Sequence, residues 1–172
     1  MEYTNINVRN NVLNIGMNPR DGIVAFDEFT VDIYCNGVTD VTIAGAGEFE
    51  CADEIKRPSF NANISGAGTL KGNIECDIFN LNISGGGFVT MVGNTKEANI
   101  TCNTGGGGFG TFGTFGGKNF IMNNATIDID GSVTAEVNVA EYLNASSTGN
   151  SKIGYYGNPQ INIRGNRNNV KR

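Results

Sequence analysis

The stretch that decides the fold is Asn61-Ala62-Asn63-Ile64-Ser65-Gly66-Ala67-Gly68, because it returns 19 residues later as Asn80-Leu81-Asn82-Ile83-Ser84-Gly85-Gly86-Gly87. In both copies apolar residues alternate with asparagine, which is the period-two pattern of a strand with one buried face. Each copy ends in a Gly-X-Gly corner, where glycine permits the positive φ of a sharp bend. The two copies therefore predict a strand and a corner that repeat together.

Weaker copies of the same pattern run along the rest of the chain. An earlier copy lies at residues 41–47, and later copies lie near residues 99–101, 126–131, 145–149 and 161–165. One landmark from each copy, at positions 43, 64, 83, 100, 129, 147 and 163, gives steps of 21, 19, 17, 29, 18 and 16. Only the fourth step is out of line, and it contains an insertion. A unit of this size cannot bury its apolar face alone, so the repeat indicates a solenoid.

Each corner is followed by a second short strand, as at residues 69–71, 88–92 and 133–137. Apolar residues nowhere show helical spacing, and the two-residue turns typical of hairpins are scarce between the strands. The predicted fold is all-β: a right-handed, single-stranded parallel β-helix (a β-solenoid) of about 7–9 rungs with no substantial α-helix. We expect one domain over residues 1–172, with repeats over 41–170 and a Gly/Phe-rich insertion at 103–119.

The first 40 residues fit the repeat less well. They predict strands from Ile6 to Ile15, from Gly22 to Phe29 and from Thr30 to Asn36, around a turn at residues 19–22. An open solenoid end is an exposed sheet edge that must be covered. We therefore expect residues 1–40 to act as N-terminal capping strands.

Composition excludes several classes of function. The net charge of −5 and pI of about 4.7 give no reason to expect nucleic acid as a partner. No apolar run is long enough for a membrane span. The chain has no histidine, which excludes Ser–His and Cys–His catalysis, and we predict neither an enzyme nor a cofactor. The start of the chain lacks the basic and apolar regions of a signal peptide, so either export follows another route or a signal has been removed.

The four cysteines, Cys35, Cys51, Cys76 and Cys102, have neither C-x-x-C spacing nor a nearby histidine. No metal site is predicted from them. We expect them to serve as small apolar residues in strands, with disulfides between stacked turns as an open alternative.

Two acidic residues, Asp128 and Asp130, lie two apart and so on one face of a strand. Enzymes on this scaffold that cut acidic polysaccharides use such acids together with Arg or Lys. No basic residue lies in register with the pair on a clear neighbouring copy, so we predict no catalytic residue here.

A glycine-rich tract at residues 105–117 carries Phe109, Phe112 and Phe115, one phenylalanine at every third position. These three residues are a candidate contact loop that docks on a second subunit, a glycan or a protein. The alternative is an insertion folded back over the side of the solenoid. The tract lacks the Lys-Ser/Thr of a phosphate-binding loop.

Five Asn-x-Ser/Thr sequons occur, at Asn63, Asn82, Asn99, Asn124 and Asn144. Three of them coincide with the strand repeat, with the asparagine facing outward. We interpret them as a by-product of the repeat and not as glycan acceptors.

Residues 64–68 (Ile-Ser-Gly-Ala-Gly), 83–87 (Ile-Ser-Gly-Gly-Gly) and 153–159 (Ile-Gly-Tyr-Tyr-Gly-Asn-Pro) resemble the GIN-domain family. That family is described as the head domain of auto-transporter adhesins and is common in Bacteroidetes. The resemblance extends over roughly residues 40–170. It implies a right-handed β-helix, a cell-envelope or extracellular location and no known catalytic residues.

The leading hypothesis is a non-enzymatic, surface or adhesion-type structural module that acts by binding or assembly. Its partners would be a second copy of the chain, or a glycan or protein on another surface. A phage virion structural or fibre component is the alternative, for which a missing signal peptide is natural, so a virion or cytoplasmic location stays open. A β-helix polysaccharide lyase or hydrolase that uses Asp128 and Asp130 is the third hypothesis.

Overall fold

A computed structural model describes residues 4–17, 29–104, 113–165 and 170–172, and these contain strands but no helix. The chain divides into two compact units, Met1–Tyr34 and Cys35–Arg172, and each is described by itself. Within the described residues no helix is long and apolar enough to cross a membrane.

The first unit contains a two-stranded antiparallel hairpin of β1 (Thr4–Arg9) and β2 (Val12–Met17). Its turn is formed by Asn10 and Asn11, whose φ angles are 50° and 63°. Asparagine adopts this left-handed conformation more readily than most residues. The predicted single strand from Ile6 to Ile15 is therefore wrong, because these two asparagines reverse the chain.

The other two strands predicted in this region were those from Gly22 to Phe29 and from Thr30 to Asn36. Residues 30–36 form no strand, so that prediction is wrong, and most of the segment from residue 22 to 29 lies outside the described residues. The capping role of the N-terminal segment stays a prediction.

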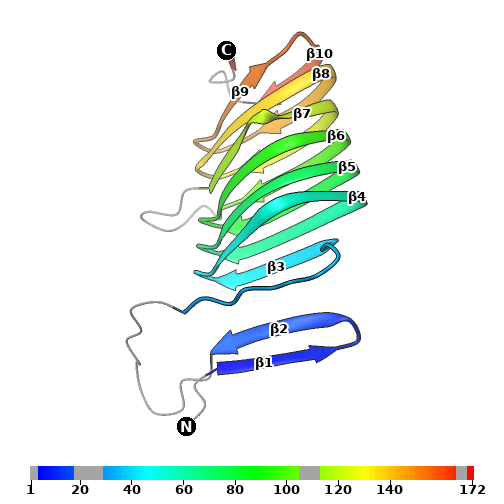
Figure 1. The fold of residues 1–172 in the computed structure, drawn as a ribbon. Helices are drawn as coiled ribbons and strands as arrows, with labels where there is room; N and C mark the ends of the chain where they lie inside the picture. Colours follow the sequence, from blue (N-terminus) through cyan, green and yellow to red (C-terminus); the bar gives the residue numbers. More distant parts are fainter. Residues whose placement is uncertain (1–3, 18–28, 105–112, 166–169) are drawn as a thin grey trace. The chain divides into compact units, whose positions relative to one another are not determined.

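The second unit is a parallel β-solenoid of about 6 turns, so the fold class is confirmed and the expected 7–9 rungs are too many (Figure 1). The count is lower because the strands near the two ends of the stack, residues 40–45 and 160–165, have only 6 residues each and do not form complete turns. The strands are β3 (Asp40–Gly45), β4 (Glu48–Gly66), β5 (Thr69–Gly85), β6 (Phe88–Asn103), β7 (Gly113–Asp130), β8 (Val133–Ser147), β9 (Lys152–Tyr156), β10 (Gln160–Gly165) and β11 (Val170–Lys171). Along the stack each strand from β3 to β8 pairs in parallel with the next, and β8 then pairs with both β9 and β10.

The pairing register fixes the true length of each repeat. Positions 43, 64, 83, 102, 129, 147 and 165 lie in one column, so the steps are 21, 19, 19, 27, 18 and 18. Ile64 and Ile83 lie in adjacent turns, as predicted. The landmarks at 100 and 163 were each two residues out of register. This error left the predicted facing correct because side chains alternate with a period of two along a strand.

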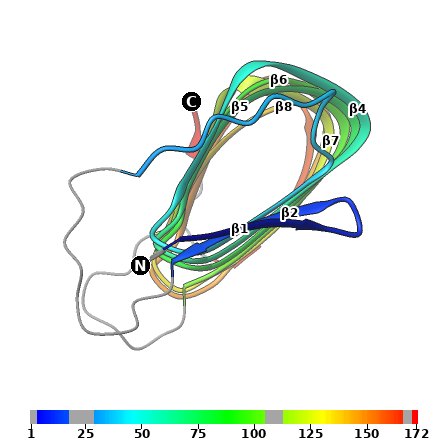
Figure 2. The ribbon, with the colours of Figure 1, turned by 60° about the horizontal axis from the view of Figure 1, so that its bottom comes forward.

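The long step has a local cause. β6 ends at Asn103 and β7 begins at Gly113, so the extra chain falls between these two residues. Residues 113–119 were predicted to belong to the insertion, but they lie in β7: residues 113–117 pair with β8, and residues 114–116 and Asn119 pair with β6, with a register shift in each pairing. Figure 2 shows the turns of the second unit following one another around a common oval outline.

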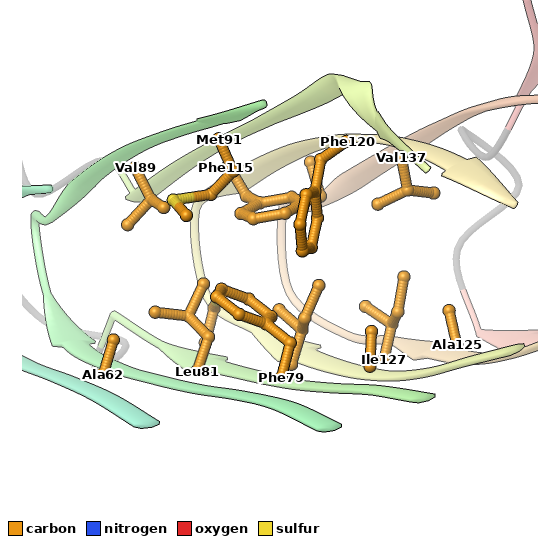
Figure 3. Packing of buried hydrophobic residues seen from close by; sticks show 14 of the residues in the cluster. Ala62, Phe79, Leu81, Val89, Met91, Phe115, Phe120, Ala125, Ile127 and Val137 are labelled. Atoms are coloured by element: carbon orange, nitrogen blue, oxygen red, sulfur yellow. The ribbon is translucent and has the colours of Figure 1, made fainter. Parts of the chain in front are cut away.

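The core is filled by side chains that point inward from opposite walls of the solenoid (Figure 3). Phe60 and Phe79 stack on adjacent turns with ring centroids 6.2 Å apart, and Phe79 meets the ring of Phe120 edge-on at 5.0 Å. Ala98 and Ala125 occupy the column of Phe79 on the next two turns, which leaves room for the Phe120 ring. Small and large residues thus alternate between the walls, and interior packing of this kind resists changes in volume.

The two glycines of a Gly-X-Gly corner are needed for different reasons. Gly85 has a φ of +127°, and a Cβ there would lie 2.6 Å from the carbonyl oxygen of Gly66 on the preceding turn. Gly87 needs no positive φ, but its Cβ would lie 2.9 Å from a methyl group of Ile64 and 3.0 Å from one of Ile83. The first glycine makes the bend and lets turns approach. The second leaves space for the isoleucine column.

Candidate binding face

One wall of the solenoid presents a regular array of uncharged polar side chains. They point outward from the second half of β4, β5 and β6, where their inward neighbours are core residues. We call this three-by-three set the polar array: Asn61, Asn63, Ser65, Asn80, Asn82, Ser84, Asn99, Thr101 and Asn103. Successive turns are about 4.8 Å apart, and neighbouring columns, two residues apart along a strand, are about 6.6 Å apart.

The first column of the polar array is a ladder of side-chain amides. Asn80 Nδ2 donates to Asn61 Oδ1 at 2.8 Å, and Asn99 Nδ2 donates to Asn80 Oδ1 at 2.9 Å. Asn61 Nδ2 in turn donates to Asp40 Oδ1 at 2.8 Å. Each amide therefore points the same way along the axis, which fixes its orientation and gives the column a direction.

Asp40 lies at the start of this ladder, where its carboxylate accepts hydrogen bonds and donates none. Its carboxylate receives hydrogen bonds from Thr39 Oγ1 at 2.6 Å and from Asn61. These two bonds, that from Thr39 first, lower the pKa of Asp40 below its usual value. The ladder is interrupted where Thr126 takes the column position, and it resumes with Asn162 Nδ2 donating to Asn144 Oδ1 at 3.0 Å.

The middle column of the polar array differs from the first because its side chains form no hydrogen bonds with other described residues. Asn63, Asn82 and Thr101 are exposed, and none has a side-chain hydrogen bond to another described residue. Amide groups carry two N–H donors and an oxygen with two lone pairs, and a hydroxyl is both donor and acceptor. This column therefore offers donors and acceptors to a ligand at a constant spacing.

Asp128 and Asp130 continue the second and third columns on the turn after the polar array, and both are exposed on one face as predicted. Asp130 Oδ1 accepts a hydrogen bond from Thr148 Oγ1. Asp128 lies between Thr101 and Ser146 in its column, and Arg164 follows Ser146. Sequence reasoning missed Arg164 in this register because the last landmark was two residues out. No group of three or more potential metal ligands occurs among residues with a described position.

Three lysines outside the polar array pair with acidic residues of neighbouring turns. Lys56 Nζ lies 2.9 Å from Glu75 Oε2, and Lys96 Nζ lies 2.6 Å from Asp77 Oδ1. The hydrogen bond to Glu75 is the largest cause of a raised pKa at Lys56. Lys71 Nζ pairs in the same way with Glu48 at 2.7 Å. These exposed pairs hold neighbouring turns in register and contribute little free energy individually.

The candidate contact loop requires one correction. Phe115 is 0% exposed and lies in the inward column between Val89 and Ala135, so the prediction that it is a contact residue is wrong. The alternation of β7 is broken at Lys118 and Asn119, two consecutive exposed residues beside register shifts in the pairing with β6 and β8, and this break places Phe115 inside. Phe109 and Phe112 lie outside the described residues, and a contact role for them stays a prediction. Phe88 was overlooked, although it is 49% exposed at the outward position just before Val89.

The cysteines divide by burial. Cys76 and Cys102 are buried core residues, as expected, whereas Cys35 is exposed outside any strand; no disulfide joins the four. Burial raises the pKa of the Cys102 thiol to about 12. Burial, with a smaller contribution from Cys35, raises the pKa of Cys51 to about 11.

The sequons at Asn63, Asn82 and Asn99 fall on the polar array, where each asparagine faces outward and its Ser or Thr takes the next outward position. The strand repeat therefore accounts for their spacing.

Comparison with known proteins places this geometry in a family. Residues 1–159 match the family described as "Putative auto-transporter adhesin, head GIN domain". This match covers most of the 172 residues, so the chain belongs to that family. The sequence has no significant match among the curated proteins.

Two solved structures are similar. One is a "putative adhesin" from Parabacteroides distasonis ATCC 8503, with 20% identity, a TM-score of 0.73, and coverage of 98% of this chain and 78% of that chain. The other is a "putative adhesin" from Parabacteroides merdae ATCC 43184, with 18% identity, a TM-score of 0.70, and coverage of 98% and 77%. At these identities the similarity is one of fold.

Proposed function

Since the chain belongs to the GIN-domain family of adhesin heads, we propose that it is a non-enzymatic surface module that attaches by binding through its polar array. The observation that carries this proposal is the middle column, Asn63, Asn82 and Thr101. It presents exposed hydrogen-bonding groups that no described residue satisfies.

The array is suited to binding because the strands that carry it are held in place before a ligand arrives. The first column is locked by its own amide ladder, and the side chains between the outward positions, such as Ala62, Ile64 and Leu81, are fixed in the core. Preorganised groups lose little conformational freedom when they bind. Contacts that are weak one at a time also add up when they repeat on a rigid scaffold.

The family supports a location at the cell surface or outside the cell, where such a module would work. Catalysis is less well supported. The two acids of this wall, Asp128 and Asp130, are flanked by Thr101, Asn103 and Ser146, and the basic residue of the column is two turns from Asp128. The family name and this arrangement both favour attachment over the virion and lyase hypotheses.

Attachment of fluorescently labelled protein to cultured epithelial cells tests the proposal. We expect wild-type protein to bind saturably and the double variant Asn63→Ala/Asn82→Ala to bind about 5- to 140-fold more weakly, since two lost hydrogen bonds of about 0.5–1.5 kcal/mol each total about 1–3 kcal/mol. The control is Asn94→Ala, because Asn94 is also an exposed outward asparagine but lies in an earlier part of β6, outside the polar array, between Glu75 and Ile121. Equal attachment of the double variant and the control would contradict the proposal.

A further inference from the structure

We infer that the ligand of the polar array is a neutral polysaccharide chain, laid along the solenoid axis so that successive sugars meet successive turns. This inference rests on the proposed function of the same face and adds the chemical class and direction of the ligand.

Charge is the first argument for a neutral ligand. None of the nine side chains of the polar array is charged, although 17% of the residues in the whole chain are Asp, Glu, Lys or Arg. The charges nearest along its columns are carboxylates: Asp40 precedes the first column, and Asp128 and Asp130 follow the second and third. A polyanion, whether a uronic-acid polymer or a nucleic acid, would lie between negative groups with no adjacent cation. An uncharged ligand meets no such repulsion.

The kind of side chain is the second argument. Protein interfaces are anchored by aromatic or other large apolar residues, and the polar array contains none. It contains amides and hydroxyls, which can donate and accept at the same site. Sugar hydroxyls have the same dual capacity, so a polyhydroxylated chain can pair with these groups. A protein partner could pair with only part of the array.

Repetition is the third argument. The spacing between turns is constant at about 4.8 Å through the stacked strands, because it is set by backbone hydrogen bonds. A straight polymer that advances by about one turn for each sugar ring can therefore place one ring on each of β4, β5 and β6. An extended chain, as in β-1,4-linked glucans and mannans, fits a straight column better than a coiled α-linked chain.

The amide ladder adds a direction to this ligand. Each Nδ2 in the first column points to the preceding turn, so the face differs when viewed from its two ends. A polysaccharide also has two different ends. One orientation of the chain on the array should therefore be preferred.

Titration of the full chain with defined hexasaccharides tests the inference. The probes are cellohexaose and mannohexaose as extended neutral chains, hexagalacturonate as the anionic chain and maltohexaose as the coiled one, with binding followed by calorimetry. We expect at least one extended neutral chain to bind at least 10-fold more tightly than the other two probes. The Asn82→Ala variant should weaken that binding several-fold and Asn94→Ala should not. Matching circular dichroism spectra would show that both variants are folded.

Cell attachment separates this inference from the proposed function. Periodate treatment of the cells, which cleaves sugar diols, should abolish attachment, whereas protease treatment should leave most of it. The inference is overturned if hexagalacturonate binds best, if no neutral hexasaccharide binds, or if protease and not periodate abolishes attachment. In the last case the proposed function would still hold, with a protein as the ligand, provided that attachment still depends on Asn63 and Asn82.

Discussion

Replacing Phe115 with alanine tests whether this residue lies in the core, as the structure shows, or belongs to the candidate contact loop. The ring is 0% exposed, and its column neighbours Val89 and Ala135 are too small to fill the space it would leave. The ring also packs closely on the backbone, since a Cβ at Gly117 would lie 2.3 Å from its Cε1 atom. Complete truncation of a buried phenylalanine costs about 3–5 kcal/mol. This is a large part of the roughly 5–15 kcal/mol that stabilises a typical domain.

Urea unfolding followed by far-UV circular dichroism measures the effect, because the chain has no tryptophan for fluorescence. Phe88→Ala is the matched control: Phe88 lies at the start of the preceding turn but is 49% exposed, and we expect it to cost at most about 1 kcal/mol. A lower midpoint at unchanged slope reports a loss of stability. If Phe115→Ala unfolds at the same urea concentration as Phe88→Ala, Phe115 does not lie in the core and the contact loop extends to it.

Three further predictions concern the glycine corners and the cysteines. Gly87→Ala should lower the free energy of unfolding by about 1–3 kcal/mol, because its Cβ would crowd two isoleucine methyl groups. Gly116→Ala, whose Cβ would meet no atom closer than 3.5 Å, should be nearly neutral in the same urea assay, and equal costs would argue against the packing described. At pH 8 a thiol reagent should modify Cys35 quickly and Cys102 only on unfolding. Because the pKa of Cys102 is about 12 in the folded protein and near 9.0 in the unfolded chain, its contribution to stability is complete below pH 9 and falls by about 1.4 kcal/mol per pH unit as the pH rises towards 12. Cys102→Ala should flatten that alkaline slope, and an unchanged slope would contradict the assignment.

The successes and errors of the sequence reasoning have a common physical origin. Alternation of Asn with Ala, Leu or Ile at residues 61–64 and 80–83 correctly assigned the inward and outward faces, because facing depends only on local strand geometry. Near Phe115 this alternation is broken at Lys118 and Asn119, and the glycines around Phe115 have no side chain to mark which positions point inward. The turn at Asn10 and Asn11 was missed because neither residue is the glycine that usually marks such hairpins.

The candidate binding face was only partly visible in the sequence. The outward asparagines of the repeat could be identified, and a side-chain ladder could be expected from them. The sequence could not show which asparagine side chains form hydrogen bonds within the protein, because Asn80 and Asn82 have the same local pattern. Only the stacked structure shows that Asn80 bonds to Asn61 and Asn99, while Asn82 is left open to solvent.

The sequence by itself determined the class of fold, the repeat and the inward and outward faces of its clearest copies, residues 61–64 and 80–83. The tertiary structure alone decided which residues share a column, and therefore that Arg164 follows Ser146 and that Phe115 follows Val89. The reason is that paired residues on neighbouring turns of this solenoid are 16 to 27 residues apart in the sequence and are joined by backbone hydrogen bonds between turns. A slip of two residues changes every such neighbour but leaves the alternation along the strand as it was.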